Sequence, residues 1–200
     1  MSSKGLPDAS SIDASPGVAG ASSWLQRWSH LITPGGSVLD LACGTGRHMK
    51  VLADQGHPVT GIDRSPVALQ SAARFGEAVL ADLENEPWPL TNGSQVREFD
   101  AVVVFNYLWR ALFPLIEQSL AAGGVLIYET FAQGNETLGK PAHPDFLLRP
   151  AELLCAFDKL HLIAFEQGFL DKPPRFVQRI VAARVNSLAS VDAAQRRFAL

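Results

Sequence analysis

Three aspartates end or follow short apolar runs in the first half of the chain, and a glycine-rich turn lies beside the first of them. Asp40 precedes the turn that contains Gly44 and Gly46, and Asp63 and Asp82 come with the next two apolar runs. A carboxylate accepts hydrogen bonds from hydroxyl, amino and ammonium groups. Glycines let the backbone turn sharply and approach a ligand closely. This combination predicts a binding site for a polar ligand with hydroxyl and amino groups.

A nicotinamide dinucleotide is one ligand that fits this pattern. Asp63 lies 19 positions after Gly44, close to the spacing of roughly 20 residues for an acid that binds a ribose. Two features disfavour the dinucleotide. Met49 occupies the position of the third glycine of the motif, and the negative charge of Asp40 would repel a pyrophosphate. An NAD(P)-dependent oxidoreductase is therefore an alternative function.

S-adenosylmethionine is the second ligand, because it carries a sulfonium and an ammonium as well as one carboxylate. Asp40 suits the positive groups, and Asp63 suits the two ribose hydroxyls. Asp82 suits the adenine amino group, while the backbone N–H of Leu83 would donate to the ring. The N-terminus of the following helix, or a nearby arginine, suits the carboxylate. The three acids favour this ligand over a dinucleotide.

The elements that must position these residues follow from the apolar periodicity and the turn residues. Buried strands are expected over residues 37–43, 58–63, 78–83, 99–107, 125–131, 161–169 and 175–185. Helices are expected over residues 24–28, 47–55, 65–75, 113–122 and 150–157. The last two strands are joined by Lys172-Pro173-Pro174, a connection too short for a helical crossover, so they should form an antiparallel hairpin.

The alternation of strands and helices predicts an α/β fold. We expect a Rossmann-like, doubly wound sheet that is mostly parallel and has a C-terminal antiparallel strand. Ligands of such sheets bind beyond the carboxyl ends of the strands, where the strand order reverses. The acids and the glycine turn should therefore meet at one edge of the sheet.

Several runs resemble motifs of the class I S-adenosylmethionine-dependent methyltransferases. The run VLDLACGTGRHMKVLADQGHPVTGIDRSPVAL resembles their glycine and ribose motifs. ADL at 81–83 and FDAVVVFNYL at 99–108 resemble the adenine and fourth-strand motifs, and LAAGGVLIYETF at 120–131 resembles the fifth. The likeness covers about residues 24–185. The segment FLLRPAELLCAF also looks similar to small bacterial methyltransferases of the tellurite-resistance type, which does not identify the methyl acceptor.

The resemblance implies S-adenosylmethionine as the cofactor and a set of residues around it. These comprise residues at the methionine end, at the ribose and adenine, and beneath the sulfonium. They are Asp40, Ala42, Gly44, Gly46, Asp63, Arg64, Asp82, Leu83, Asn106 and Tyr107. The family has no fixed catalytic residue, so none is implied.

The candidate general bases come from position alone. Glu129, at the end of an apolar strand, is the first candidate, and His143, in the long loop 132–149, is the second. Glu129 could instead pair with an arginine, and His143 could be a solvated loop residue. The loop could cover the substrate. Arg27, in the expected first helix, could bind the cofactor carboxylate or pack on the surface.

Length and composition limit the remaining possibilities. A chain of 200 residues suggests one domain, and 17 Lys and Arg against 20 Asp and Glu provide no positive field for nucleic acid. A nucleic-acid substrate is disfavoured without being excluded, and a small-molecule acceptor is expected. Two cysteines suggest a reducing compartment and no zinc site. No run is apolar enough to span a membrane, so a cytoplasmic location is expected.

The domain organisation expected from composition is simple. Residues 1–22 are rich in Ser, Gly, Ala, Asp and Pro and are expected to form a flexible tail. Residues 23–186 should form the methyltransferase domain, and residues 187–200 a tail or short helix. A protein that binds S-adenosylmethionine without catalysis is the other alternative, in which the loop 132–149 would block the acceptor site. The oligomeric state is not predicted.

Overall fold

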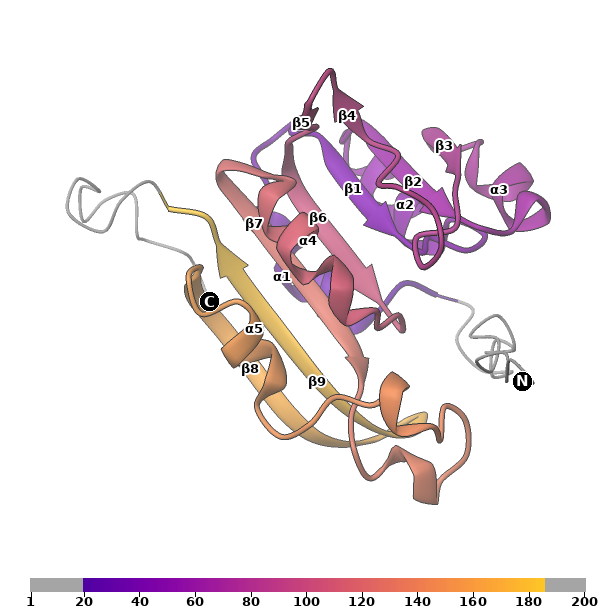
Figure 1. The fold of residues 1–200 in the computed structure, drawn as a ribbon, viewed down its shortest axis with the longest axis vertical. Helices are drawn as coiled ribbons and strands as arrows, with labels where there is room; N and C mark the ends of the chain where they lie inside the picture. The colour runs from indigo at the N-terminus through magenta and orange to yellow at the C-terminus, as the bar shows by residue number, and fades with distance from the viewer. Residues whose placement is uncertain (1–19, 186–200) are drawn as a thin grey trace, which may run out of the picture.

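A computed structural model of the chain describes residues 20–185 (Figure 1). Seven strands form one sheet in the order β3-β2-β1-β6-β7-β9-β8. They are β1 (Val38–Leu41), β2 (Val59–Asp63), β3 (Glu77–Leu80), β6 (Phe99–Phe105), β7 (Leu120–Phe131), β8 (His161–Asp171) and β9 (Pro174–Ala183). A separate hairpin contains β4 (Thr91–Asn92) and β5 (Gln95–Val96).

The helices are short. The α-helices are α1 (Ser23–Trp28), α2 (Arg47–Asp54), α3 (Pro66–Ala72), α4 (Phe113–Gln118) and α5 (Glu152–Ala156). The 3₁₀ turns are η2 (Ser29–Leu31), η3 (Arg110–Leu112), η4 (Asn135–Thr137) and η5 (Pro144–Phe146). No helix within residues 20–185 has the length and apolar character needed to cross a membrane.

The sheet has the topology that the sequence predicts. Its neighbours pair in parallel from β3 to β7, while β9 pairs antiparallel with both β7 and β8. The chain moves outward from β1 through β2 to β3 and then returns to β6, on the other side of β1. The strand order therefore reverses between β1 and β6, and the carboxyl ends of these two strands form the expected ligand-binding edge.

The core has two layers, one on each face of the sheet. Helices α1, α2 and α3 cover one face, and α4 and α5 cover the other (Figure 1). Neighbouring side chains of a strand point to opposite faces, so Val102 and Val104 belong to one layer and Ala101 and Val103 to the other. Burial on both faces explains why β6 is a continuous apolar run.

Several element boundaries differ from the expectation. The third strand ends at Leu80 instead of 83, so residues 81–83 lie in the following turn. The helix expected over 113–122 ends at Gln118, and β7 begins at Leu120, which pairs with Phe99 of β6. Gly123 and Gly124 bond to the backbone of Arg184 beyond β9. The hairpin of β4 and β5 was not predicted.

The described N-terminal residues include one that composition assigns to the tail. Ser22, which composition places in the tail, is buried, and its hydroxyl caps α1 by accepting a hydrogen bond from the N–H of Trp24. The expectations for residues 1–19 and for the C-terminal segment 186–200 lie outside the described residues.

Candidate functional site

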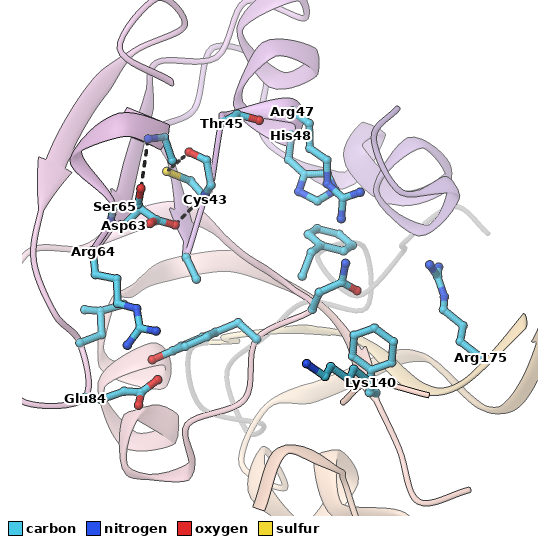
Figure 2. Close-up of a pocket in the computed structure, with 18 of the residues that line it drawn as sticks. Cys43, Thr45, Arg47, His48, Asp63, Arg64, Ser65, Glu84, Lys140 and Arg175 are labelled. Carbon is cyan, nitrogen blue, oxygen red and sulfur yellow. Dashed lines mark hydrogen bonds between the residues drawn. The ribbon is translucent and has the colours of Figure 1, made fainter. Parts of the chain in front are cut away.

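A cavity of about 850 Å³ lies at the carboxyl ends of the parallel strands (Figure 2). The turns that follow β1, β2, β3, β6 and β7 all contribute to its wall, as does the turn between β8 and β9. Its position is the one predicted for the ligand site from the reversal of strand order.

The glycine turn after β1 forms one wall of the cavity. Ala42 and Gly44 line it, and both adopt left-handed backbone conformations, with φ of 52° and 55°. Gly46 differs from the expectation, because it is not among the lining residues. A Cβ at Gly46 would lie 2.8 Å from the Cα of Ala72, so this glycine lets α2 pack closely on α3. Its role is in the packing behind the cavity.

Asp63, at the end of β2, fixes the glycine turn in place. Its Oδ2 accepts a hydrogen bond from the N–H of Gly44 at 2.8 Å, and its Oδ1 accepts one from the N–H of Ser65 at 2.9 Å. Asp63 also lines the cavity. Each carboxylate oxygen keeps acceptor capacity beyond one bond. The residue can therefore accept from two ribose hydroxyls in a fixed orientation.

Asp40 is buried directly behind this turn. Asp40 is 1% exposed and does not line the cavity. Its Oδ2 has no hydrogen-bond partner among the described residues. Burial raises the pKa of Asp40 to about 8, against the opposing effect of the nearby Arg47. A buried acceptor without a donor is unusual in a folded protein. A cationic donor supplied by a ligand would satisfy it.

The turn after β3 forms the opposite side of the cavity. Asp82 and Leu83 both line it, together with Arg64 from the turn after β2. The Oδ1 of Asp82 accepts from the N–H of Glu84, and its Oδ2 accepts from the Nδ2 of Asn85. The side-chain bond from Asn85 is the main cause that lowers the pKa of Asp82. The carboxylate thus shapes its own turn at the cavity, and contact with adenine stays a prediction.

The turn after β6 brings two further predicted residues to the cavity. Asn106 lines it with a left-handed φ of 56°, and its N–H donates to the carbonyl of Glu129. Tyr107 lines it too, and its carbonyl accepts a hydrogen bond from the Tyr128 hydroxyl at 2.9 Å. Burial raises the pKa of the Tyr107 phenol well above its usual value. Both residues are therefore held rigidly from the neighbouring strand.

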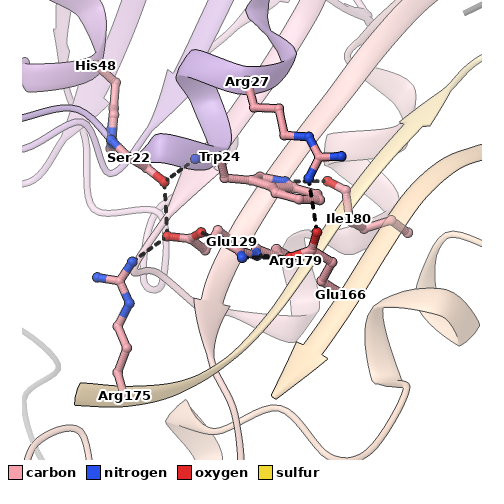
Figure 3. Close-up of polar contacts among 9 residues, drawn as sticks. All are labelled: Ser22, Trp24, Arg27, His48, Glu129, Glu166, Arg175, Arg179 and Ile180. Atoms are coloured by element: carbon pink, nitrogen blue, oxygen red, sulfur yellow. Dashed lines mark hydrogen bonds and ion pairs between the residues drawn. The ribbon is translucent and has the colours of Figure 1, made fainter. Parts of the chain in front are cut away.

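Glu129 does not stand where a general base is needed. It is 1% exposed and is absent from the cavity wall. Its Oε1 accepts from the Ser22 hydroxyl at 3.1 Å and from Arg175 at 3.0 Å, and its Oε2 accepts from Arg179 at 3.2 Å (Figure 3). Both carboxylate oxygens are engaged by cations. This is the pairing with arginine that the sequence left as the alternative to a base role.

His143 and Arg27 also lie away from the cavity wall. His143 is exposed, and its Nδ1 accepts from the N–H of Asp145 to cap η5. The guanidinium of Arg27 pairs with Glu166 at 3.2 Å and stacks on Trp28 at 4.7 Å, which is the surface alternative. Neither geometry supports the catalytic or carboxylate-binding role considered for these residues.

The residues that the sequence reasoning missed include four basic side chains of the cavity wall: Arg47, His48, Lys140 and Arg175. Arg47 begins α2 directly after the glycine turn, and this position was a usable signal. Lys140 lies in the loop 132–149, which does line the cavity in part. Arg175 starts the last strand, far from the motifs along the chain. No local pattern connects it with the glycine turn.

His48 is an uncharged part of the cavity wall. Its Nε2 accepts a hydrogen bond from the N–H of Ser22 at 3.2 Å, and its ring packs 4.1 Å from the ring of Phe105 between centroids. Burial lowers the pKa of His48 to about 3, and the charge of Arg47 adds to this effect. Its acceptor nitrogen is therefore in use by the protein.

Comparisons with known proteins agree with this geometry. Residues 38–124 match the family model Methyltransf_25, described as a methyltransferase domain. A demethylmenaquinone methyltransferase of Tropheryma whipplei is 38% identical over 76 residues, which are 36% of this chain and 30% of that protein. A ribosomal protein L11 methyltransferase of Burkholderia multivorans is 35% identical over 109 residues, which are 48% of this chain and 34% of that protein. The chain spans about a third of the length of these relatives.

The fold is shared with solved structures. TehB from Haemophilus influenzae superposes with a TM-score of 0.66 at 16% identity, over 84% of this chain and 63% of that chain. An identity this low demonstrates the fold alone. The family match thus identifies a methyltransferase domain over residues 38–124, and the chain shares the fold of TehB over 84% of its length.

Proposed function

We propose that this chain binds S-adenosylmethionine in the cavity and transfers its methyl group to a small-molecule acceptor. The observation that carries the proposal is the buried carboxyl of Asp40, whose Oδ2 lacks a donor within the described part of the chain. The cofactor's methionine end brings an ammonium to this region. A dinucleotide would bring a pyrophosphate instead, which offers this carboxyl no cationic donor.

Residues of the cavity wall, and Asp40 directly behind it, are assigned to the groups of the cofactor. Asp63 accepts from the ribose hydroxyls and Asp40 compensates the ammonium. Arg47, at the first position of α2, pairs with the methionine carboxylate beside the helix N-terminus. The adenine lies against Leu83 and Arg64, with Asp82 toward its amino group.

The chain's part in the reaction is placement. When bound, S-adenosylmethionine supplies a methyl group that is already activated by its sulfonium. Asp63 and the glycine turn orient the ribose, and Asn106 and Tyr107 form the surface that faces the methyl group. Among the described residues of the cavity wall, His48 is the single imidazole, and its Nε2 already accepts from Ser22. We therefore assign no general base.

Calorimetric titration with S-adenosylmethionine, S-adenosylhomocysteine and NADH tests the cofactor. We expect binding of the two adenosyl ligands and none of NADH. Asp63→Ala should weaken the adenosyl ligands by roughly ten- to a hundredfold, since charge-assisted hydrogen bonds contribute about 1.5–3 kcal/mol. Asp54→Ala is the matched control, because Asp54 is exposed on α2 and its ion pair within residues 20–185 is with Lys50. Binding of NADH alone would overturn the proposal in favour of an oxidoreductase.

Release of S-adenosylhomocysteine in the presence of candidate acceptors tests the transfer. A protein that binds the cofactor and never releases this product with any acceptor class would be a binding protein without catalysis. The composition supports a small acceptor over nucleic acid, since acidic residues outnumber basic ones. We also keep a cytoplasmic location as a prediction, and the two unpaired cysteines agree with a reducing compartment.

A further inference from the structure

Three cationic side chains gather at the end of the cavity that the adenosine groups leave free. Figure 2 places Arg47, Lys140 and Arg175 on the side opposite Arg64 and Glu84. They come from three different segments: the start of α2, the loop after η4 and the start of β9. The proposed cofactor has one carboxylate, which Arg47 serves. The other two cations, Lys140 and Arg175, line the same cavity.

Arg175 pairs with a carboxylate and keeps a donor that has no partner within residues 20–185. Its side chain is 11% exposed, and its Nη2 contacts the Oε1 of Glu129 at 3.0 Å. Glu129 also pairs with Arg179, so one carboxylate serves two guanidinium groups. The Nε of Arg175 is buried and has no hydrogen-bond partner among the described residues. The field of Arg175 also contributes to lowering the pKa of Arg47, after the larger effect of burial. Arg179 also pairs with Glu166, so the donor of this cluster that a ligand would satisfy is the Nε of Arg175.

Lys140 supplies the second positive charge. It lines the cavity and is exposed to solvent. Within residues 20–185 no hydrogen-bond or ion-pair partner of Lys140 is found. A lysine ammonium on a flexible stem provides three donors to an incoming anion. Its charge is therefore available to a ligand.

The side chain of Asn135 joins the segments that carry these two cations. Asn135 is buried, and its Nδ2 donates to the carbonyl of Pro141 at 3.1 Å, directly after Lys140. Its Oδ1 accepts from the N–H of Phe176 at 3.3 Å, directly after Arg175. A single amide thus holds both cations at the same cavity wall. Such preorganisation is typical of a built binding site.

Glu129 positions Arg175 from the other side. Figure 3 shows its carboxylate between Ser22, Arg175 and Arg179, at the end of β7. The network continues from Arg179 to Glu166 at 2.6 Å. Glu129 is thus a positioning residue that fixes the guanidinium of Arg175.

We propose that Lys140 and Arg175 form a subsite for an anionic oxygen group of the methyl acceptor, a carboxylate or a phosphate. A planar guanidinium and an ammonium that line the same cavity can both donate to the oxygens of either group. The inference rests on the proposed methyl transfer and deepens it, because it gives the acceptor's chemical class. The anionic group anchors the acceptor, and no covalent step is assigned to either cation.

Binding of simple anions to the complex with S-adenosylhomocysteine tests this subsite. The probes are inorganic phosphate, followed by ³¹P line broadening, and ¹³C-labelled acetate, followed by carboxyl line broadening, at constant ionic strength. We expect saturable binding of at least one probe to the wild type. Phosphate alone, acetate alone or both would assign a phosphate, a carboxylate or either group to the acceptor.

Variants locate the binding. Lys140→Gln should weaken it by roughly tenfold or more, since a charge-assisted hydrogen bond contributes about 1.5–3 kcal/mol. Arg175→Lys should also weaken anion binding, because lysine lacks the planar fork of the guanidinium. Lysine was chosen because its positive charge still compensates the buried carboxylate of Glu129. The matched control Lys159→Gln removes an exposed lysine 3.9 Å from Glu117 and should bind as the wild type does.

The outcomes separate this inference from the proposed function. Tight binding of S-adenosylhomocysteine without saturable anion binding would overturn the subsite and leave the cofactor assignment intact. Anion binding unchanged in both Lys140→Gln and Arg175→Lys would also overturn it. Failure of the wild type to bind S-adenosylhomocysteine at all would overturn the proposed function, and the acceptor subsite with it.

Discussion

Replacement of Asp40 by asparagine should change how the stability of the protein depends on pH. Asp40 is buried, and its pKa rises from the ordinary value of 3.8 to about 8 in the folded protein. Between these values the folded state holds a proton that the unfolded chain has released. The stability contribution is complete below pH 3.8 and is lost as the pH rises toward 8. The amide of the Asp40→Asn variant cannot ionise, so this loss should vanish.

The size of the effect follows from the shift. Each pH unit within the window costs about 1.4 kcal/mol. For a pKa of about 8, the buried Asp40 therefore lowers the free energy of unfolding, relative to its value below pH 3.8, by about 3 kcal/mol at pH 6 and about 5 kcal/mol at pH 8. The free energy of unfolding of Asp40→Asn, minus that of the wild type, should grow by about 2 kcal/mol over this range. That difference corresponds to about 1 M in the urea midpoint.

Urea unfolding of both proteins at pH 6, 7 and 8 measures this difference directly. Asp54→Asn is the control, because this exposed aspartate lies on α2 and should leave the pH dependence unchanged. Parallel pH curves for the wild type and Asp40→Asn would refute the assignment of a protonated, buried Asp40. The same variant should bind S-adenosylhomocysteine more weakly, by roughly ten- to a hundredfold, if its carboxylate compensates the ammonium.

Three further substitutions test the packing of α2 on α3 and the two candidate general bases. Gly46→Ala should lower the free energy of unfolding, measured in urea, by about 2–4 kcal/mol, because the new Cβ would lie 2.8 Å from the Cα of Ala72 at a φ of 82°. At Gly44 a Cβ would meet no atom within 4 Å, so Gly44→Ala should cost only the backbone strain of about 1 kcal/mol. A loss for Gly46→Ala below about 1 kcal/mol would contradict the packing role. Glu129→Gln should weaken phosphate or acetate binding and spare S-adenosylhomocysteine; lost turnover with both affinities intact would restore its role as a base. His143→Ala should leave turnover within about twofold, as an exposed cap outside the cavity, and a large decrease would reopen its catalytic role.

The part of the cavity wall around Gly44 and Asp63 could be anticipated from local sequence pattern. Asp63 and Gly44 lie at strand ends that the apolar runs mark, and parallel strands bring their carboxyl ends to one edge. The structure joins these two residues by a hydrogen bond of 2.8 Å. Arg47 was equally accessible, since it is the first residue after the glycine turn.

The role of individual side chains could not be anticipated in the same way. Its position at the end of an apolar strand made Glu129 a candidate base, but its carboxylate pairs with Arg175 and Arg179, which lie 46 and 50 positions later. Gly46 shares its motif with Gly44 and yet faces α3, because the helix that follows turns it away from the cavity. Spacing along the chain carries no information about such contacts.

The sequence by itself determined the parallel sheet, the closing hairpin, the glycine turn and the acids beside it, because hydrophobic periodicity and turn chemistry are local properties. Only the tertiary structure decided which charges meet. The segments of Lys140 and Arg175 are joined through the side chain of Asn135. The carboxylate of Glu129 pairs with two arginines and does not line the cavity. Electrostatic partners are set by distance in space, and the antiparallel return of β9 beside β7 fixes those distances only when the whole sheet has formed.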